Sequence, residues 1–170
     1  FEGIASLVAQ RCLGGRATRG WVTRRSGDGG IDFVNRLDVG VGFGSLGLVV
    51  LGQAKLKRPD KGSVSGRELA RVVSRLRRGW IGAFVTTGVY SREAQSEVLG
   101  DGFPVLLING RRLADELLKE LDETGLSLEQ LLAREEQWYE QNQSALAPEH
   151  VLSGVQAGQQ IWPTTPADGQ

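Results

Sequence analysis

The chain has 170 residues, 40% of them hydrophobic, and its 20 Lys and Arg side chains balance 20 Asp and Glu side chains. This length suits one domain with an appendage. The single cysteine, Cys12, excludes an internal disulfide, and the single histidine, His150, excludes histidine-based metal clusters and Ser-His triads. No apolar run reaches the length of a membrane span and no secretory signal is evident, so we expect a cytoplasmic protein without a membrane partner.

The neutral total hides a division of charge between the two halves of the chain. Residues 1–80 hold 15 Lys and Arg against 6 Asp and Glu, whereas residues 81–170 hold 5 against 14. A basic half suits an anionic polymer, because its field attracts and neutralises phosphates. The acidic half would repel that polymer, and we expect its helices to contact protein. A solvated surface with chance asymmetry is the alternative.

In chain order, apolar residues recur at helical spacing over the first 13 positions, and Gly14-Gly15 ends that helix. Three strands follow, over residues 20–26, 31–39 and 46–56. Ser65 and Glu68 form a capping box that opens a helix to about Arg78. The remaining elements alternate between strand and helix, over residues 80–87, 91–99, 104–109 and 111–123.

This order of elements predicts an α/β fold, because strands that alternate with helices pair in parallel. We expect residues 1–123 to form a mixed five-stranded sheet flanked by helices. Residues 124–170 would form a C-terminal extension packed on that core, with a helix over 127–143 whose partly apolar face includes Glu135 and Trp138, and an irregular tail. The chain lacks methionine even at position 1, so we expect a piece of a longer protein.

The candidate chemistry lies in the run Gly27-Asp28-Gly29-Gly30-Ile31-Asp32 and the triplet Gln53-Ala54-Lys55. Side chains two apart on a strand share a face, so Gln53 and Lys55 project together, and a hairpin brings Asp32 beside them. Mg²⁺ prefers oxygen ligands, which Asp32, Gln53 and the Ala54 backbone carbonyl would supply. Lys55 would orient or deprotonate the attacking water and offset charge on a phosphodiester. The alternative is an ordinary strand end beside a turn.

Two other readings of this region are weaker. Asp28 would share a strand face with Asp32 and is a rival ligand, although a turn is more natural among three glycines. The stretch Gly42–Gly47 fits GxGxxG, but a strand rather than a helix follows it, so a nucleotide site is not expected.

Cations and hydroxyls around the motif are candidate contacts to a DNA backbone, which position a duplex without reading its sequence. The amides at the start of the Ser65 helix would bind a phosphate. The candidates are Arg24, Arg25, Lys57, Arg58, Lys61, Ser63, Ser65 and Arg67, extended by Arg71, Arg75 and Arg78. The alternative for each residue taken singly is a solvated position on the surface of the protein. Thr86, Thr87 and Tyr90 would shape the cleft edge or serve the core or a turn.

With these motifs the sequence resembles the Mrr-type endonuclease family of the PD-(D/E)XK nuclease superfamily. The resemblance covers residues 1–121 and includes Glu2, the Asp32 and Gln53–Lys55 motifs, and the stretches 84–87 and 107–110. Glutamine in place of the usual acid is a variant within that family. The separation of Asp32 from Gln53 is similar to that in modification-dependent restriction enzymes of the MspJI type.

The resemblance implies a restriction-endonuclease-like core that cleaves double-stranded DNA with Mg²⁺, for which Mn²⁺ substitutes. By that resemblance Asp32 binds the metal, Gln53 is the second ligand, Lys55 is the catalytic lysine and Glu2 supports the metal through water. The alternative for Glu2 is a charge that complements the helix dipole. An N-terminal module absent from this sequence would read a modified base such as 5-methylcytosine. Because each site cuts one strand, we expect a homodimer or higher oligomer.

Two rival functions stay open. A structure-selective nuclease of the Holliday-junction type shares this core. A DNA-binding or assembly module that has lost catalysis is the other, because an amide at position 53 forfeits one anionic ligand.

Overall fold

The computed structural model describes residues 1–23, 30–58 and 62–154. The helices are α1 (Glu2–Leu13), α2 (Gly66–Val73), α3 (Arg92–Asp101), α4 (Gly110–Thr124) and α5 (Leu128–Gln141), with 3₁₀ turns η1 (Gly42–Gly44) and η2 (Pro148–Ser153). The strands are β1 (Ala17–Thr23), β2 (Phe33–Val39), β3 (Leu46–Lys55), β4 (Ser63–Val64), β5 (Ile81–Thr86), β6 (Val89–Tyr90), β7 (Val105–Ile108) and β8 (Gln143–Ser144).

The main sheet is mixed, as the order of elements predicts. Its strand order is β7-β5-β3-β2-β1-β8, in which β1, β2 and β3 form an antiparallel meander and β5 and β7 add in parallel. The expectation of five strands is wrong by one, because β8 pairs in parallel with the end of β1. A strand of two residues has no periodicity that a sequence pattern can reveal. Strands β4 and β6 form a separate small sheet.

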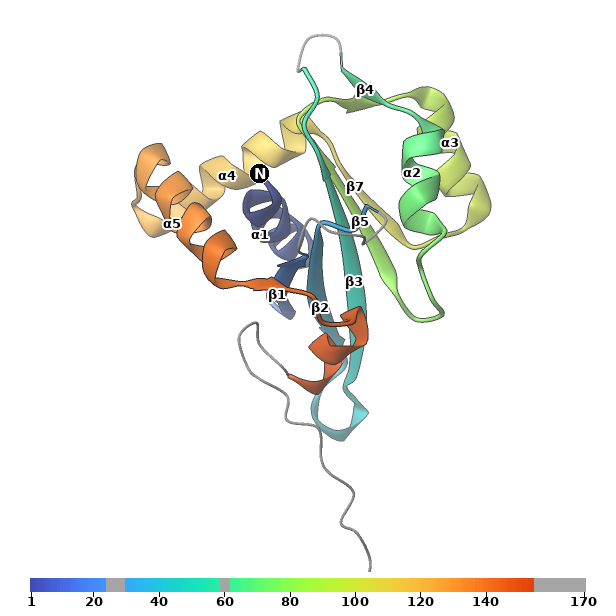
Figure 1. Cartoon of the computed structure of the whole chain (residues 1–170), viewed down its shortest axis with the longest axis horizontal. Helices are drawn as coiled ribbons and strands as arrows, with labels where there is room; N and C mark the ends of the chain where they lie inside the picture. Colours follow the sequence, from blue (N-terminus) through green and yellow to red (C-terminus); the bar gives the residue numbers. More distant parts are fainter. Residues whose placement is uncertain (24–29, 59–61, 155–170) are drawn as a thin grey trace, which may run out of the picture.

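Helices cover both faces of this sheet (Figure 1). Helices α1 and α4 pack on the face that carries Phe33, Val50 and Val85, whereas the opposite face is shared between two further clusters. One of these lies under α2 and α3 around Phe84, and the other surrounds Trp21. Neighbouring residues of each strand thus enter different clusters, as the twofold alternation of a strand requires.

Helix α2 is shorter than its sequence pattern predicts. The capping box of Ser65 and Glu68 is present, but the helix ends at Val73 rather than at Arg78. The N–H groups of the next residues donate three positions back, which tightens the chain into a turn. Leu76 then packs against the Trp21 cluster instead of continuing the face of α2. A tertiary contact therefore overrides the helical period here.

The C-terminal segment returns to the core after α5. Val151 of η2 is 5% exposed and belongs to the Trp21 cluster, and the C=O of Leu152 accepts a hydrogen bond from Arg36 at 2.8 Å. The part of the expected irregular tail from residue 155 onward lies outside the described residues. Within the described ranges no helix is both long and apolar enough to cross a membrane.

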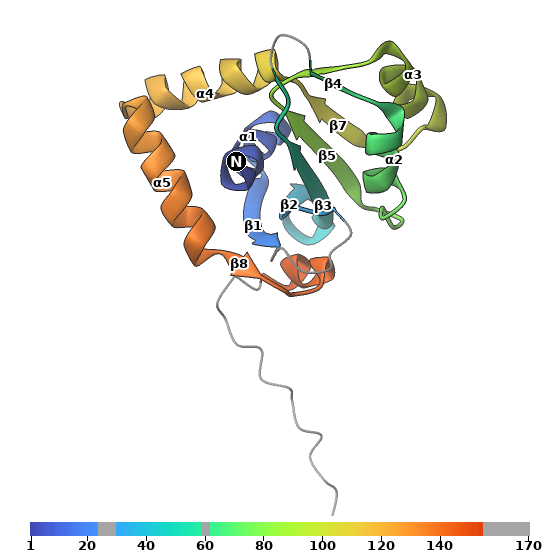
Figure 2. The same cartoon turned by 45° about the horizontal axis from the view of Figure 1, so that its top comes forward.

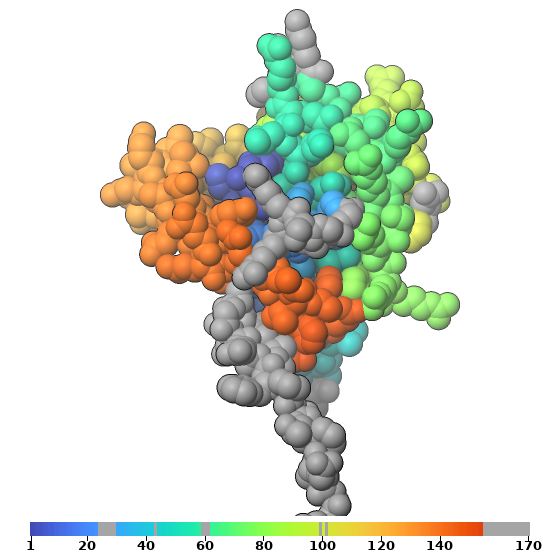
Figure 3. Space-filling view, in the orientation of Figure 1, coloured from blue at the N-terminus to red at the C-terminus, as the bar shows by residue number. Residues whose placement is uncertain are grey.

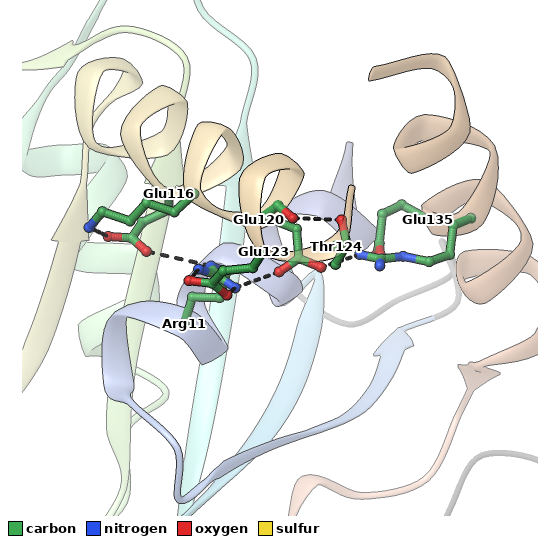
Figure 4. Close-up of polar contacts among 8 residues, drawn as sticks. Arg11, Glu116, Glu120, Glu123, Thr124 and Glu135 are labelled. Atoms are coloured by element: carbon green, nitrogen blue, oxygen red, sulfur yellow. Dashed lines mark hydrogen bonds and ion pairs between the residues drawn. The ribbon is translucent and has the colours of Figure 1, made fainter. Parts of the chain in front are cut away.

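Several carboxylates of the acidic half are paired with arginines of the same chain. Figure 4 shows Arg11 of α1 directed at the carboxylates of α4, where it pairs with Glu116, Glu120 and Glu123 at 3.5, 2.5 and 2.9 Å. Glu120 also pairs with Arg134 of α5 at 2.7 Å. Part of the acidity that suggested a protein-contacting surface therefore joins α1, α4 and α5 to one another.

Candidate active site

Asp32 lies directly before β2, between β1 and β3. Its N–H donates to the C=O of Gly52 at 2.8 Å, and its C=O accepts from the N–H of Thr23 at 3.0 Å. Its carboxylate oxygen Oδ2 accepts from the N–H of Ala54 at 2.7 Å. These bonds bring the predicted acid to the middle residue of the Gln53-Ala54-Lys55 triplet. They engage the N–H of Ala54, whereas sequence analysis proposes its carbonyl as a ligand.

The close approach of β2 and β3 at this point depends on a glycine. Gly52 is paired with Phe33 in the register of the two strands, and a Cβ at position 52 would collide with the buried Phe33 ring. A side chain there would separate the strands that carry Asp32 and Gln53. The glycine before the triplet is therefore a packing requirement of the site.

Gln53 and Lys55 share one face of β3 but differ in environment. Gln53 is 9% exposed, and its Oε1 is buried without a hydrogen-bond partner in the part of the chain that the structure describes. Lys55 is exposed at the end of the strand. The amide oxygen thus sits in a desolvated position, and the ammonium group stands where solvent or a ligand reaches it.

The end of β3 is held by two threonines of the neighbouring chain segment. The Thr86 hydroxyl donates to the C=O of Lys55 at 2.9 Å. The Thr87 hydroxyl accepts from the N–H of Lys57 at 2.8 Å and donates to its C=O at 2.6 Å. The threonines therefore fix the backbone that carries both lysines, a role that sequence analysis does not resolve.

Glu2 joins the same group of charges from the start of α1. Its Oε2 is buried and, over the described residues, lacks a hydrogen-bond partner. Burial raises the pKa of Asp32 from 3.8 to about 6; the Ala54 N–H and the charge of Lys55 oppose this rise, and the charge of Glu2 adds to it. The charges of Glu2 and Lys55, which are far apart in the sequence, therefore both act on the ionisation of Asp32.

The donor set suits a hard divalent cation. Among the described residues, no group of three or more His, Cys, Asp and Glu side chains is placed to hold a metal. The oxygen donors of this site are instead two carboxylates, those of Glu2 and Asp32, and the amide of Gln53. A buried polar atom without a partner costs about 1–3 kcal/mol, and both Glu2 and Gln53 contribute such an oxygen. Oxygen-only ligands match the preference of Mg²⁺. Glu2, Asp32 and Gln53 therefore fit this ion.

The candidate DNA contacts divide into described and undescribed residues. Arg24, Arg25 and Lys61, together with the rival ligand Asp28, lie outside the described residues. Ser65 begins α2, and its N–H donates to Glu68 at 3.1 Å. Lys57 pairs with Glu68 at 2.9 Å, so a phosphate would compete with that carboxylate. Among the other cations, Arg67, Arg71, Arg75 and Arg78 are exposed.

A cavity of about 300 Å³ is lined by Ile31 and Leu51 of the Trp21 cluster, by Arg75, Arg77 and Trp80, and by residues 144–148. Arg77 lies 5.1 Å from the ring centroid of Trp80 and pairs with Glu149. Figure 3 shows this face, where the green segment that carries these cations meets the red C-terminal turn. Two arginines of the segment after α2, Arg75 and Arg77, therefore line this cavity.

The fold is that of the restriction endonuclease class. The family model for the restriction endonuclease catalytic domain of the Mrr type matches residues 5–117, and the chain belongs to this family. The resemblance and the fold class drawn from the sequence are thereby confirmed.

Two solved structures are similar to the chain, and no curated protein sequence matches it. The MspJI restriction endonuclease in complex with a 27-mer oligonucleotide is 46% identical, with a TM-score of 0.83 over 90% of this chain and 35% of the other. The DNA modification-dependent restriction endonuclease AspBHI is 27% identical, with a TM-score of 0.63 over 80% of this chain and 34% of the other. The chain spans about a third of each.

One group near the site escaped sequence analysis. Arg19 of β1 and Glu135 of α5 are a buried ion pair with an N···O distance of 2.8 Å, and the Arg19 guanidinium lies 3.4 Å from the Trp138 ring centroid. The sequence feature that could have indicated this pair is Glu135, an acid on the apolar face of the helix predicted over 127–143. A buried carboxylate requires a cation, but the pattern does not say which one.

Proposed function

We propose that this chain is the Mg²⁺-dependent DNA endonuclease domain of a modification-dependent restriction enzyme, hydrolysing phosphodiester bonds of double-stranded DNA. The observation that carries the proposal is the hydrogen bond of Asp32 to Ala54, which sets the acid between Gln53 and Lys55. Family membership and the two similar restriction enzymes support it. Dependence on 5-methylcytosine belongs to the same proposal, since AspBHI is described as modification-dependent.

The proposed roles follow from charge and burial. Asp32 and Gln53 hold the ion, Glu2 supports it through water, and the Ala54 carbonyl is a further ligand. When bound, Mg²⁺, or Mn²⁺ in its place, lowers the pKa of a coordinated water and polarises the phosphate. Lys55 orients that water and offsets the negative charge that develops on the phosphate. Burial keeps the pKa of Asp32 high until a cation stabilises its ionised form.

The proposed DNA contacts flank the Asp32 and Gln53–Lys55 motifs in the sequence. Arg67 and the amides at the start of α2 hold one phosphate, and Lys57 reaches another by leaving Glu68. Arg24, Arg25, Lys61 and Ser65 complete the set.

The assembly is part of the proposal. Residues 1–123 are the nuclease core and residues 124–170 its extension. A separate N-terminal module reads the modified base, and two or more copies of the chain cut both strands. Like other restriction nucleases, the protein acts on DNA in the cytoplasm.

Plasmid cleavage tests the proposal. The full chain is incubated with 5-methylcytosine-containing or unmodified plasmid, with Mg²⁺, Mn²⁺ or EDTA. We expect Asp32→Ala and Lys55→Ala each to lower cleavage at least a hundredfold while the circular dichroism spectrum is kept. The control, Asp122→Ala on the exposed side of α4, should cut like the parent. Parental activity in Asp32→Ala would refute the site assignment.

The alternative supported by a specific observation is a module that binds DNA without cutting it. Its support is Gln53, which gives the metal a neutral oxygen where a carboxylate would bind more strongly. Retained DNA binding without product, even at high protein and Mn²⁺ concentrations, would favour this alternative. Cleavage of four-way junctions irrespective of modification would instead favour the structure-selective nuclease.

A further inference from the structure

The first turn of α1, which carries Glu2, is fastened to the sheet by Arg19 of β1. Arg19 donates from Nη2 to the C=O of Gly3 at 2.8 Å and from Nε to the Ser6 hydroxyl at 3.3 Å. The N-cap residue Phe1 makes no side-chain capping bond. The guanidinium of Arg19 is therefore in contact with the backbone of the residue that follows Glu2.

Arg19 is itself held by α5. Its Nη2 forms an ion pair with Oε2 of Glu135 at 2.8 Å, and the guanidinium carbon lies 3.4 Å from the ring centroid of Trp138, one helical turn away. The side chains of Arg19 and Glu135 are 12% and 3% exposed. Burial lowers the pKa of Arg19, and the charge of Glu135 opposes that shift. Without this partner, a buried guanidinium would have to move toward solvent.

Helices α1 and α5 also touch directly beside Glu2. A Cβ on Gly3 would lie 3.0 Å from the backbone oxygen of Glu135 and 3.5 Å from the Cβ of Tyr139. Figures 1 and 2 show α5 running along α1 on the side away from the sheet. The position of the first turn of α1 is thus set between β1 and α5.

We propose that Arg19, oriented by Glu135 and Trp138 of α5, is a positioning residue for the nuclease centre, because it fixes the turn of α1 that carries Glu2. This inference rests on the proposed function, in which Glu2 supports the metal. It makes helix α5, in the extension beyond the nuclease core, a structural requirement for binding of the metal. Loss of orienting contacts behind a metal ligand typically weakens metal affinity or activity about 10- to 100-fold.

The test compares two mild variants, Arg19→Lys and Glu135→Gln, with the matched control Arg11→Lys. Arg11 is a largely buried arginine of α1 that pairs with carboxylates of α4, about 13 Å along the helix from Glu2. We expect Arg19→Lys and Glu135→Gln to raise the Mg²⁺ concentration for half-maximal cleavage about tenfold. In the absence of DNA, Mg²⁺ should raise the melting temperature of the protein. The two variants should increase, by a similar factor, the Mg²⁺ concentration at which half of this rise is reached. Arg11→Lys should lower the melting temperature and leave both concentrations unchanged.

A double-mutant comparison with Glu2→Gln separates positioning from general loss of stability. If Arg19 acts through Glu2, Arg19→Lys has no further effect on the Mg²⁺ requirement in the Glu2→Gln background. The inference is overturned if the effects of Arg19→Lys and Glu2→Gln on the Mg²⁺ requirement multiply in the double variant. It is also overturned if Arg19→Lys and Glu135→Gln, like Arg11→Lys, leave both Mg²⁺ concentrations unchanged. Asp32→Ala is measured in parallel: if it cuts like the parent, the proposed function fails and this inference with it. If Asp32→Ala is inactive while the Arg19 variants are unshifted, only the present inference fails.

Discussion

Replacing the buried acid of the site should make the metal-free protein more stable. The pKa of Asp32 rises from 3.8 to about 6 on folding because of burial, with a contribution from Glu2. A difference of about 2 units corresponds to an upper limit of about 3 kcal/mol of destabilisation at neutral pH. In Asp32→Asn the amide oxygen can still accept the Ala54 N–H, and no charge is buried beside Glu2. We therefore expect a gain of about 1–3 kcal/mol in the free energy of unfolding.

The sign of the pH dependence follows from the raised pKa. Below about pH 4 the carboxyl is protonated in both the folded and unfolded states, so it adds no penalty. Between about pH 4 and 6 the folded state binds more protons, so the parent loses stability as the pH rises. The advantage of Asp32→Asn should accordingly be small at pH 4 and reach its full size above pH 7.

Urea denaturation in EDTA at pH 4, 6 and 7.5, followed by circular dichroism, measures this difference. The control Asp122→Asn, on the exposed surface of α4, should stay within about 0.5 kcal/mol of the parent at each pH. Added Mg²⁺ should stabilise the parent and not Asp32→Asn. A variant no more stable than the parent at pH 7.5, or an advantage independent of pH, would refute the argument from burial.

Three further changes test the packing around the site. Gly52→Ala forces its new methyl group against the Phe33 ring and should destabilise the chain by about 1–3 kcal/mol in urea denaturation. If the ring is the cause, adding Phe33→Leu should recover stability, and no recovery would exclude this cause. Thr86→Val removes the hydroxyl that holds the end of β3 and should lower the free energy of unfolding by about 1–2 kcal/mol. In plasmid cleavage it should lower kcat more than it raises KM, and a kcat equal to that of the parent would show that this hydrogen bond does not position the site. Glu68→Gln releases Lys57 and should change stability by less than about 1 kcal/mol while strengthening DNA binding at low salt; unchanged affinity in filter binding would remove Lys57 from the DNA contacts.

Local patterns were sufficient for most of the helices and strands and for the neighbourhood of Asp32 and the Gln53–Lys55 triplet. Alternation along the strand over 46–56 sets Gln53 and Lys55 on one face, and the structure has them so on β3. The capping box at Ser65 marks the start of α2 because its hydrogen bonds lie within one turn. The pairing of Asp32 with the triplet also follows from the sequence, since a meander of neighbouring strands leaves few alternatives for its register.

Contacts between segments far apart in the chain were decided only by the tertiary structure. The sixth strand, β8, exists because α5 returns the chain to the edge of β1. The pairing of Arg19 with Glu135, and that of Lys57 with Glu68, depend on where helices lie rather than on the period of either segment. Charge counts alone led us to expect that the helices of the acidic half contact another protein, whereas folding buries several of its carboxylates against arginines of the basic half of the same chain. A sequence pattern records which faces are apolar, but only packing determines which charge is buried beside which partner.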